Sequence, residues 1–239
     1  MNKKISCAAM VVGLSCGCVM QGLWSESRAF FSAFLKSPSK VASIIPSSRF
    51  LSRAMCKYTD SLEQPVRILE LGAGTGPVTE QIVAKMKEDD VLDVIEINPE
   101  LSKVLEQKFG HLPNVRILCM SMLDWEPPYK YDFVVSTMPH NTFEPDFVRL
   151  ILKGYERLIK PGGVISYVEL AVLSRLKKTF AFGESRLRIN EISQIMNDFR
   201  EKYGFDRDTV LLNAPPAHAF HLRMFDEFFN DPEMDYNKE

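Results

Sequence analysis

One stretch of this 239-residue chain predicts most of its architecture: Val66-Arg67-Ile68-Leu69-Glu70-Leu71-Gly72-Ala73-Gly74-Thr75-Gly76-Pro77-Val78-Thr79. Its first six residues form a short, mostly apolar run after a proline, which is typical of a buried parallel strand. The three glycines allow positive φ angles and let the backbone approach a ligand closely. A helix that begins at Pro77 would direct free N–H groups toward the same place. The stretch therefore predicts a strand, a ligand-binding turn and a helix in succession.

An acidic residue at the end of the next strand is the second element that a nucleotide-type site requires. Glu96 closes the run Val91-Leu92-Asp93-Val94-Ile95. It lies about twenty residues beyond Gly76, which is the separation expected of a βαβ unit. We therefore predict that Glu96 accepts hydrogen bonds from ribose hydroxyls.

The spacing of the glycines separates two classes of ligand. A dinucleotide fingerprint is Gly-x-Gly-x-x-Gly, whereas here the third glycine comes one residue early and precedes Pro77. The run from Glu70 to Gly76 resembles the first motif of class I S-adenosylmethionine-dependent methyltransferases. The stretch Glu96-Ile97-Asn98-Pro99 after the next predicted strand supports this resemblance. The alternative is a purely structural turn in another kind of α/β domain.

The resemblance implies S-adenosyl-L-methionine as the cofactor. Glu70 and the glycine turn would contact its methionine portion, although Glu70 could instead form a salt bridge that holds the strand end. Many members carry an acidic residue after the third strand for the adenine amino group; in the aligned stretch 119–124, Ser121 would take that place, or Asp124 would reach the amino group instead. The predicted cofactor residues are Glu70, Gly72, Ala73, Gly74, Thr75, Gly76, Glu96, Ile97, Ser121, Met122 and Ser136, with Ile97 and Met122 on the adenine faces.

Composition places the chain among ordinary globular proteins. With 46% hydrophobic and 25% charged residues, its length suits one domain, with or without a short extension. The formal net charge of −2 supplies no general attraction to nucleic acid, which disfavours RNA or DNA as the substrate. The five cysteines show neither a disulfide framework nor metal-ligand spacing. We therefore expect a reducing compartment and no metal.

The N-terminal region carries the signals for a membrane. Residues Ile5 to Leu23 are mostly apolar and follow Lys3 and Lys4, a pattern shared by signal peptides, spanning helices and anchors. Export, or a span with the lysines inside, would separate the enzyme from a cytosolic cofactor. We therefore expect a cytoplasmic protein held at the inner face of a phospholipid membrane, with an aromatic helix face at 30–35 beside it. The alternative is that this aromatic face packs on its own domain.

Strand and helix signals alternate regularly from Val66 onward. Helices are predicted at Val78–Lys87, from Pro99 and at Asp146–Ile159, and strands at Val115–Cys119, Tyr131–Ser136 and Val164–Leu170, with a terminal antiparallel pair at Thr209–Leu212 and Phe220–Phe225. The alternation implies a mainly parallel sheet with helices on both faces. With the resemblance above, it predicts an α/β, Rossmann-like class I methyltransferase fold with seven strands. The predicted divisions are a membrane-associating segment (1–28), N-terminal helices (29–64), the cofactor-binding domain (65–228) and a polar tail (229–239).

Further stretches narrow the resemblance to the bacterial phospholipid N-methyltransferases, which methylate phosphatidylethanolamine stepwise to phosphatidylcholine and are related to the rRNA adenine dimethylases. They are Ile45–Ser48, Val135–Asn141, Lys160–Gly163 with Ser166–Glu169, and Asn213–Ala217 with His221–Arg223. In that family a basic N-terminal helix touches the membrane. The turn Ser136-Thr137-Met138-Pro139 lacks the acidic or amide residue that base-methylating relatives carry before the proline.

An acceptor amine must lose a proton before it can attack a methyl group, so a nearby base is expected. His140 is the best placed by sequence, although a histidine in a loop is often a surface or capping residue. Tyr167 would offer a ring face to a methylated ammonium, or else belong to the core. Arg186 and Arg188 would hold a lipid phosphate, or else form a solvated basic face. The catalytic candidates are His140 and Tyr167, and the predicted substrate-binding residues are Pro139, Asn141, Arg186, Arg188 and His221.

These features favour an N-methyltransferase that acts on a phospholipid headgroup amine at the cytosolic membrane face. One alternative keeps the cofactor and changes the acceptor to adenine in RNA, a protein side chain or a small molecule. The other alternative is a non-catalytic, membrane-bound interaction module. The sequence makes no prediction about the oligomeric state.

Overall fold

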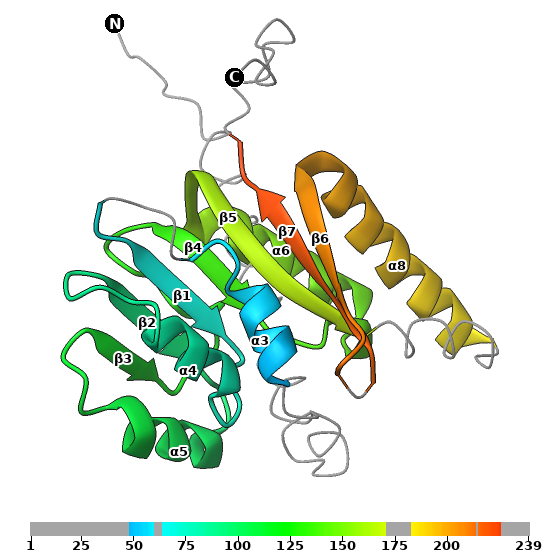
Figure 1. Ribbon diagram of the computed structural model, residues 1–239. Helices are drawn as coiled ribbons and strands as arrows, with labels where there is room; N and C mark the ends of the chain where they lie inside the picture. The colour runs from blue at the N-terminus through cyan, green and yellow to red at the C-terminus, as the bar shows by residue number, and fades with distance from the viewer. Residues whose placement is uncertain (1–47, 60–63, 171–182, 214, 226–239) are drawn as a thin grey trace, which may run out of the picture. The chain divides into compact units, whose positions relative to one another are not determined.

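The computed structural model describes residues 48–59, 64–170, 183–213 and 215–225 (Figure 1). The predicted membrane segment 1–28, most of the predicted N-terminal helices 29–64 and the predicted tail 229–239 lie outside these residues, so those divisions stay predictions. Among the described helices, none has both the length and the apolar character needed to cross a bilayer.

Seven strands form one sheet in the order β3-β2-β1-β4-β5-β7-β6. Their bounds are β1 Arg67–Leu71, β2 Val91–Ile95, β3 Val115–Leu118, β4 Tyr131–Ser136, β5 Ile159–Leu170, β6 Gly204–Val210 and β7 Ala217–Arg223. The first five strands pair in parallel, while β7 is antiparallel to both β5 and β6. The predicted mainly parallel sheet with a terminal antiparallel pair is therefore confirmed.

The last two strands are longer than the sequence pattern indicated. β6 begins at Gly204 and ends at Val210, before the predicted Leu211 and Leu212, which follow it in the hairpin turn. Its sequence, Gly-Phe-Asp-Arg-Asp-Thr-Val, is mostly polar because β6 is an edge strand with only one neighbour. An apolar pattern could not reveal such a strand.

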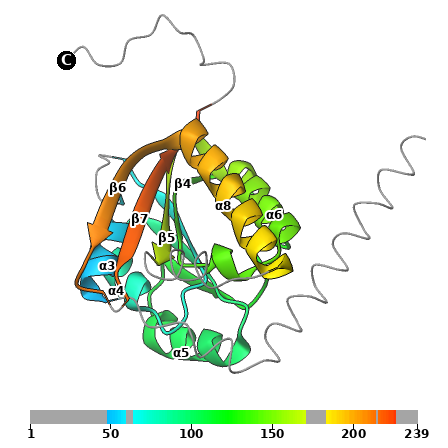
Figure 2. The ribbon, with the colours of Figure 1, turned by 90° about the vertical axis from the view of Figure 1, so that its right-hand side faces the viewer.

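Helices cover both faces of the sheet (Figures 1 and 2). They are α3 Arg49–Met55, α4 Pro77–Val83, α5 Pro99–Phe109, the 3₁₀ turn η1 His140–Thr142, α6 Pro145–Leu158 and α8 Glu184–Tyr203. Side chains of α3, α4 and α5 share one apolar core with the sheet, including Leu51, Ile82 and Leu105. Figure 2 shows α6 and α8 side by side against the opposite face.

Three helices begin at a proline close behind the carboxyl end of a strand. Pro77, Pro99 and Pro145 each occupy the first turn, where a missing N–H costs nothing. Asn98 also caps α5, since its side-chain oxygen accepts hydrogen bonds from the amides of Glu100 and Leu101. Helix α4 is shorter than predicted and ends at Val83. The edge of the sheet where the parallel strands end is called the carboxyl edge below. The glycine turn and the first turns of α4, α5 and α6 lie at this edge.

Candidate active site at the carboxyl edge

The three glycines of the turn after β1 all have positive φ, at 73° for Gly72, 61° for Gly74 and 91° for Gly76. They serve different purposes. A Cβ on Gly76 would lie 2.8 Å from Cε2 of Phe109 and 3.0 Å from Cδ2 of Leu105, so this glycine lets α5 pack closely. A Cβ on Gly74 would have no heavy atom within 4 Å. Gly74 is therefore the position at which a ligand can approach the backbone.

Glu96 follows β2, and its carboxylate contacts the glycine turn. Its Oε2 accepts a hydrogen bond from the amide of Gly74 at 2.9 Å, and its Oε1 accepts one from the amide of Asn98 at 2.9 Å. Burial raises the pKa of this carboxyl group, while the backbone donors oppose that rise. The carboxylate is thus held in place with lone pairs left for hydroxyl donors, as a ribose contact requires.

Glu70 is fully buried on β1, and neither of its carboxylate oxygens has a hydrogen-bond partner of normal geometry among the described residues. Burial raises the pKa of Glu70 to about 8, the charge of Glu96 adds to the rise, and Thr79 opposes it. No lysine or arginine of the described chain pairs with it, so within these residues no salt bridge holds the strand end at Glu70. A buried acid without a partner is costly, and a positively charged ligand group would relieve that cost.

These observations test whether the site fits S-adenosylmethionine. The unpartnered carboxyl of Glu70 lies on β1, while the open side of Gly74 and the fixed carboxylate of Glu96 follow the adjacent strands β1 and β2. Together they suit a ligand with both ribose hydroxyls and a cationic portion. The residues present therefore fit the cofactor, and their individual contacts with it stay predictions.

The residues predicted to contact the adenine, Ser121, Ile97 and Met122, differ in burial and in their neighbours. Ser121 follows β3, and its hydroxyl accepts a hydrogen bond from the amide of Leu123 at 3.2 Å. Ile97 is half-buried beside Glu96. Met122 is buried, and a Cβ built on Gly154 of α6 would lie 2.4 Å from its Cε. Since the end of Met122 packs against α6, its predicted contact with adenine gains no support.

A chain of buried polar groups begins where β4 ends. The Tyr155 hydroxyl donates to Ser136 Oγ at 2.7 Å and lies 2.8 Å from Nε2 of His140. Only 5% of His140 is exposed, and burial, with the charge of Arg200, lowers its pKa to about 4. Its Nδ1 has no hydrogen-bond partner among the described residues. His140 is therefore not a surface residue but a buried, neutral imidazole whose Nδ1 has no partner among the described residues.

Tyr167, the other catalytic candidate, closes the same region from β5. Its ring centroid lies 5.4 Å from that of His140, and it stacks on Phe220 at 5.4 Å. Its hydroxyl accepts a hydrogen bond from Arg200, which also pairs with Glu169 at 2.5 Å. Burial raises the pKa of Tyr167 above its ordinary range, so the hydroxyl stays protonated and cannot serve as a base near neutral pH.

The predicted substrate residues do not form one cluster. Pro139 and Asn141 are half-buried and flank His140. Arg188 pairs with Glu144 at 3.0 Å, which ties α8 to the start of α6, while Arg186 is exposed. Pro139 and Asn141 therefore adjoin the buried histidine, whereas Arg188 already has a carboxylate partner.

His221, the last of that set, lies buried on β7 with both ring nitrogens in use. Its Nδ1 lies 2.8 Å from Ser166 Oγ, and its Nε2 lies 3.2 Å from Asp208 Oδ2. Burial lowers its pKa, while the hydrogen bond to Asp208 opposes the change. The predicted contact of His221 with a substrate gains no support from these bonds.

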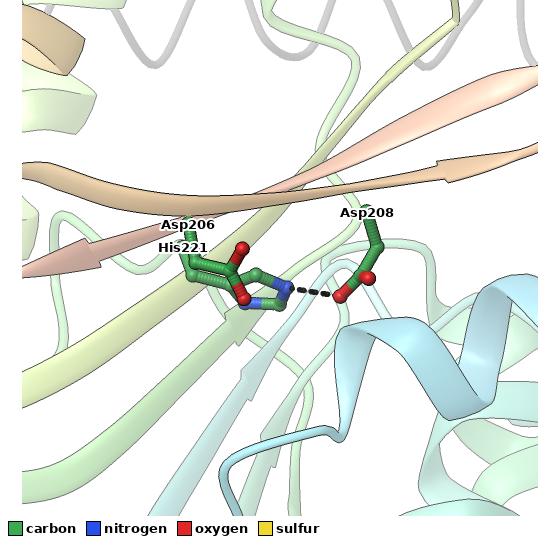
Figure 3. A group of neighbouring side chains, drawn as sticks. All are labelled: Asp206, Asp208 and His221. Atoms are coloured by element: carbon green, nitrogen blue, oxygen red, sulfur yellow. Dashed lines mark hydrogen bonds and ion pairs between the residues drawn. The ribbon is translucent and has the colours of Figure 1, made fainter.

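Asp206, Asp208 and His221 come together across β6 and β7 (Figure 3), a set of side-chain types that bind metals. The Lys57 ammonium lies 2.7 Å from Asp206 Oδ2 and 3.1 Å from Asp208 Oδ2. Tyr58 also donates to Asp206 at 2.5 Å. Since the Lys57 ammonium pairs with both carboxylates, the cluster joins the residues after α3 to the last strands of the sheet.

Comparison with known proteins agrees with this geometry. Residues 68–163 match the model of a methyltransferase domain. The ornithine lipid N-methyltransferase of Singulisphaera acidiphila is 26% identical over 209 residues, which cover 84% of this chain and 97% of that protein. A probable ribosomal RNA small subunit methyltransferase A of Methanosarcina barkeri is 35% identical over 74 residues, 31% of this chain and 24% of that protein.

Solved structures show the same fold. The N-methyltransferase NodS from Bradyrhizobium japonicum WM9 superposes with a TM-score of 0.56 at 16% identity, over 74% of this chain and 96% of that one. A second structure of NodS, in complex with S-adenosyl-L-homocysteine, superposes with a TM-score of 0.54 over 73% of this chain and 83% of that one. The fold is that of the class I methyltransferases, and the matched domain and relatives support an enzyme that uses S-adenosylmethionine.

Proposed function

We propose that this methyltransferase acts on the amine of a phospholipid headgroup, in the direction from phosphatidylethanolamine to phosphatidylcholine, at the cytosolic face of a membrane. The observation that carries the proposal is the extent of the likeness to an ornithine lipid N-methyltransferase, which spans 97% of that protein. The likeness covers 84% of this chain and so extends well beyond the cofactor turn. Phosphatidylethanolamine offers a headgroup nitrogen for such a reaction.

The residues of the turn would bind and orient the cofactor. S-adenosylmethionine, when bound, supplies a methyl group on a positively charged sulfur. The Gly74 backbone would lie against it, Glu96 would accept hydrogen bonds from its ribose, and Glu70 would face its cationic methionine portion. Alignment and exclusion of water are the main contributions that such an in-line transfer needs from a protein.

The end of β4 would receive the acceptor amine. His140 is neutral near pH 7, since its pKa is about 4, and its Nδ1 can accept a hydrogen bond from an amine N–H. A weak base of this kind orients the lone pair of an amine that arrives uncharged. The rings of Tyr155 and Tyr167 beside it would favour the cationic product.

An assay with labelled S-adenosylmethionine tests the proposal. The protein is incubated separately with vesicles that contain phosphatidylethanolamine, vesicles that contain an ornithine lipid, total RNA and a protein extract. We expect label in phosphatidylethanolamine, passing through mono-, di- and trimethylated products. Gly74→Arg, which fills the open side of the turn, is the inactive control.

RNA is the second candidate acceptor, because a ribosomal RNA methyltransferase is among the relatives. That likeness spans only 24% of the relative, and the net charge of −2 provides no general attraction to phosphate backbones. Label in RNA with none in lipid would overturn the lipid proposal and retain the methyltransferase. The non-catalytic module considered at the start is set aside, because the chain is an enzyme.

A further inference from the structure

Large apolar side chains are exposed at six described positions, and four of these lie at the carboxyl edge. Because β6 and β5 are both antiparallel to β7, β6 runs in the direction of the parallel strands and ends at this edge. Leu211 and Leu212 follow it directly and are 73% and 68% exposed. The four are Phe50, Leu187, Leu211 and Leu212, whereas Phe205 and Phe225 lie at the opposite edge.

The hairpin tip that carries the two leucines is held by hydrogen bonds. Asn213 is buried, its Oδ1 accepts from the amide of Ser48 at 3.0 Å, and its Nδ2 donates to the carbonyl of Pro215 at 2.7 Å. Ser48 is also the N-cap of α3, where its hydroxyl accepts from the amide of Leu51. The leucines thus stay exposed on a tethered turn, with Phe50 of the first turn of α3 at the same edge.

Arginines accompany the exposed apolar residues. The Arg49 guanidinium lies 5.1 Å from the ring centroid of Phe50, and Arg186 precedes Leu187 on the first turn of α8. Helix α8 leads directly into β6, so its first turn lies at the carboxyl edge, apart from the hairpin tip of β6 and β7 in Figures 1 and 2. Within the described chain, neither Arg49 nor Arg186 pairs with a carboxylate. Unpaired cations beside exposed apolar groups match the chemistry of an anionic bilayer surface.

We propose that this surface, formed by Phe50, Leu187, Leu211 and Leu212 with Arg49 and Arg186, docks the carboxyl edge onto an anionic lipid bilayer. It is called the docking edge below. The inference rests on the proposed lipid substrate. It adds the surface through which the enzyme reaches that lipid in the bilayer. The glycine turn, Glu96 and His140 all follow strands that end at this same edge. A headgroup amine reaches the site from the membrane surface, and the lipid does not leave the bilayer.

The first test measures whether the hairpin tip of the full-length protein inserts into a lipid bilayer. Leu211→Trp and Phe225→Trp place the same fluorophore at exposed sites on opposite edges of the sheet. Each is mixed with vesicles of phosphatidylcholine and phosphatidylglycerol that contain brominated acyl chains, which quench tryptophan at short range. We expect strong quenching for Leu211→Trp and little for Phe225→Trp. Equal quenching, or none at Leu211→Trp, would overturn the docking edge even if other segments bind the vesicles.

The second test concerns turnover. Leu211→Ser with Leu212→Ser should lower the rate on phosphatidylethanolamine in vesicles about tenfold, because two apolar side chains no longer enter the interface. The rate on the same lipid dispersed in detergent micelles should not change, and Phe225→Ser should leave both rates unchanged. Equal losses in vesicles and micelles would overturn the proposal.

Two further results separate this inference from the alternatives. If Leu211→Trp is quenched while no lipid is methylated, the docking edge stands and the proposed acceptor is wrong. If the leucine variant converts a dimer into a monomer in light scattering without vesicles, the surface joins two copies of the chain and the membrane proposal is overturned.

Discussion

The Tyr155 hydroxyl stands between His140 and Ser136, 2.8 Å from Nε2 of the histidine, and it donates its proton to Ser136 Oγ at 2.7 Å. A hydroxyl that has given its only proton to serine can only accept from the imidazole. Nε2 therefore carries the hydrogen in the neutral ring, and Nδ1 is left as a bare acceptor. Tyr155 thus acts as a positioning residue that selects the tautomer of His140.

This tautomer predicts an order of activities for two His140 variants. The amide of an asparagine stands near the place of Nδ1, whereas that of a glutamine stands near Nε2. We expect His140→Asn to retain about tenfold more kcat/KM for the lipid acceptor than His140→Gln, since one hydrogen bond in the transition state is at stake. Cofactor affinity should be similar in both. The reverse order would show that the bond to Tyr155 matters and that Nδ1 does not.

Substitutions at Gly74 and Gly76 should separate ligand binding from packing. Both glycines have positive φ, so alanine costs roughly 1–2 kcal/mol at either position. Gly76→Ala also drives a methyl group into Phe109 and Leu105, which adds about 1–3 kcal/mol. In thermal unfolding without cofactor, Gly76→Ala should therefore melt well below Gly74→Ala. In calorimetry, Gly74→Ala should lose the greater part of its cofactor affinity because its methyl group points into the open side of the turn.

Cofactor binding should release a proton from Glu70. In the free protein its pKa is about 8, so the carboxyl group is mostly protonated at pH 7. A cationic methionine portion beside it would favour the carboxylate, so affinity should rise with pH up to about 8 and then level off. Titration calorimetry in buffers of different ionisation enthalpy measures the released proton. Glu70→Gln should abolish the release, and an unchanged release in that variant would assign it to another group.

The Glu70 carboxyl group should also make the stability of the cofactor-free protein depend on pH. Its folded pKa of about 8 lies above the ordinary value of 4.5, so it contributes stability that is present below pH 4.5 and is lost as pH rises through 8. Glutamine mimics the protonated form. Thermal unfolding should therefore show Glu70→Gln more stable than the parent at pH 9, with a smaller advantage or none at pH 6. A constant difference at the two pH values would contradict the raised pKa.

Most of the parallel strands and the glycine turn could be predicted because their signals are local. The apolar run before Gly72, the glycine spacing and the acid at Glu96 each follow from a few consecutive residues. The same pattern could not tell Gly74 from Gly76, since that difference depends on where α5 packs. It also missed most of β6, whose polar residues suit a strand with one neighbour.

The sequence made His140 a candidate, and the tertiary structure made it a buried, neutral imidazole with a defined tautomer. Tyr155 comes from α6 and Ser136 from β4, so only folding brings these hydroxyls to the ring. The surroundings of Met122 and His221, and the gathering of Phe50, Leu187 and Leu211 at one edge, likewise depend on contacts between distant segments. Periodicity and turn chemistry act over a few residues and so determine strands, helices and the glycine turn. Burial, pKa and surface patches arise from packing across the whole chain, so only the folded protein could decide them.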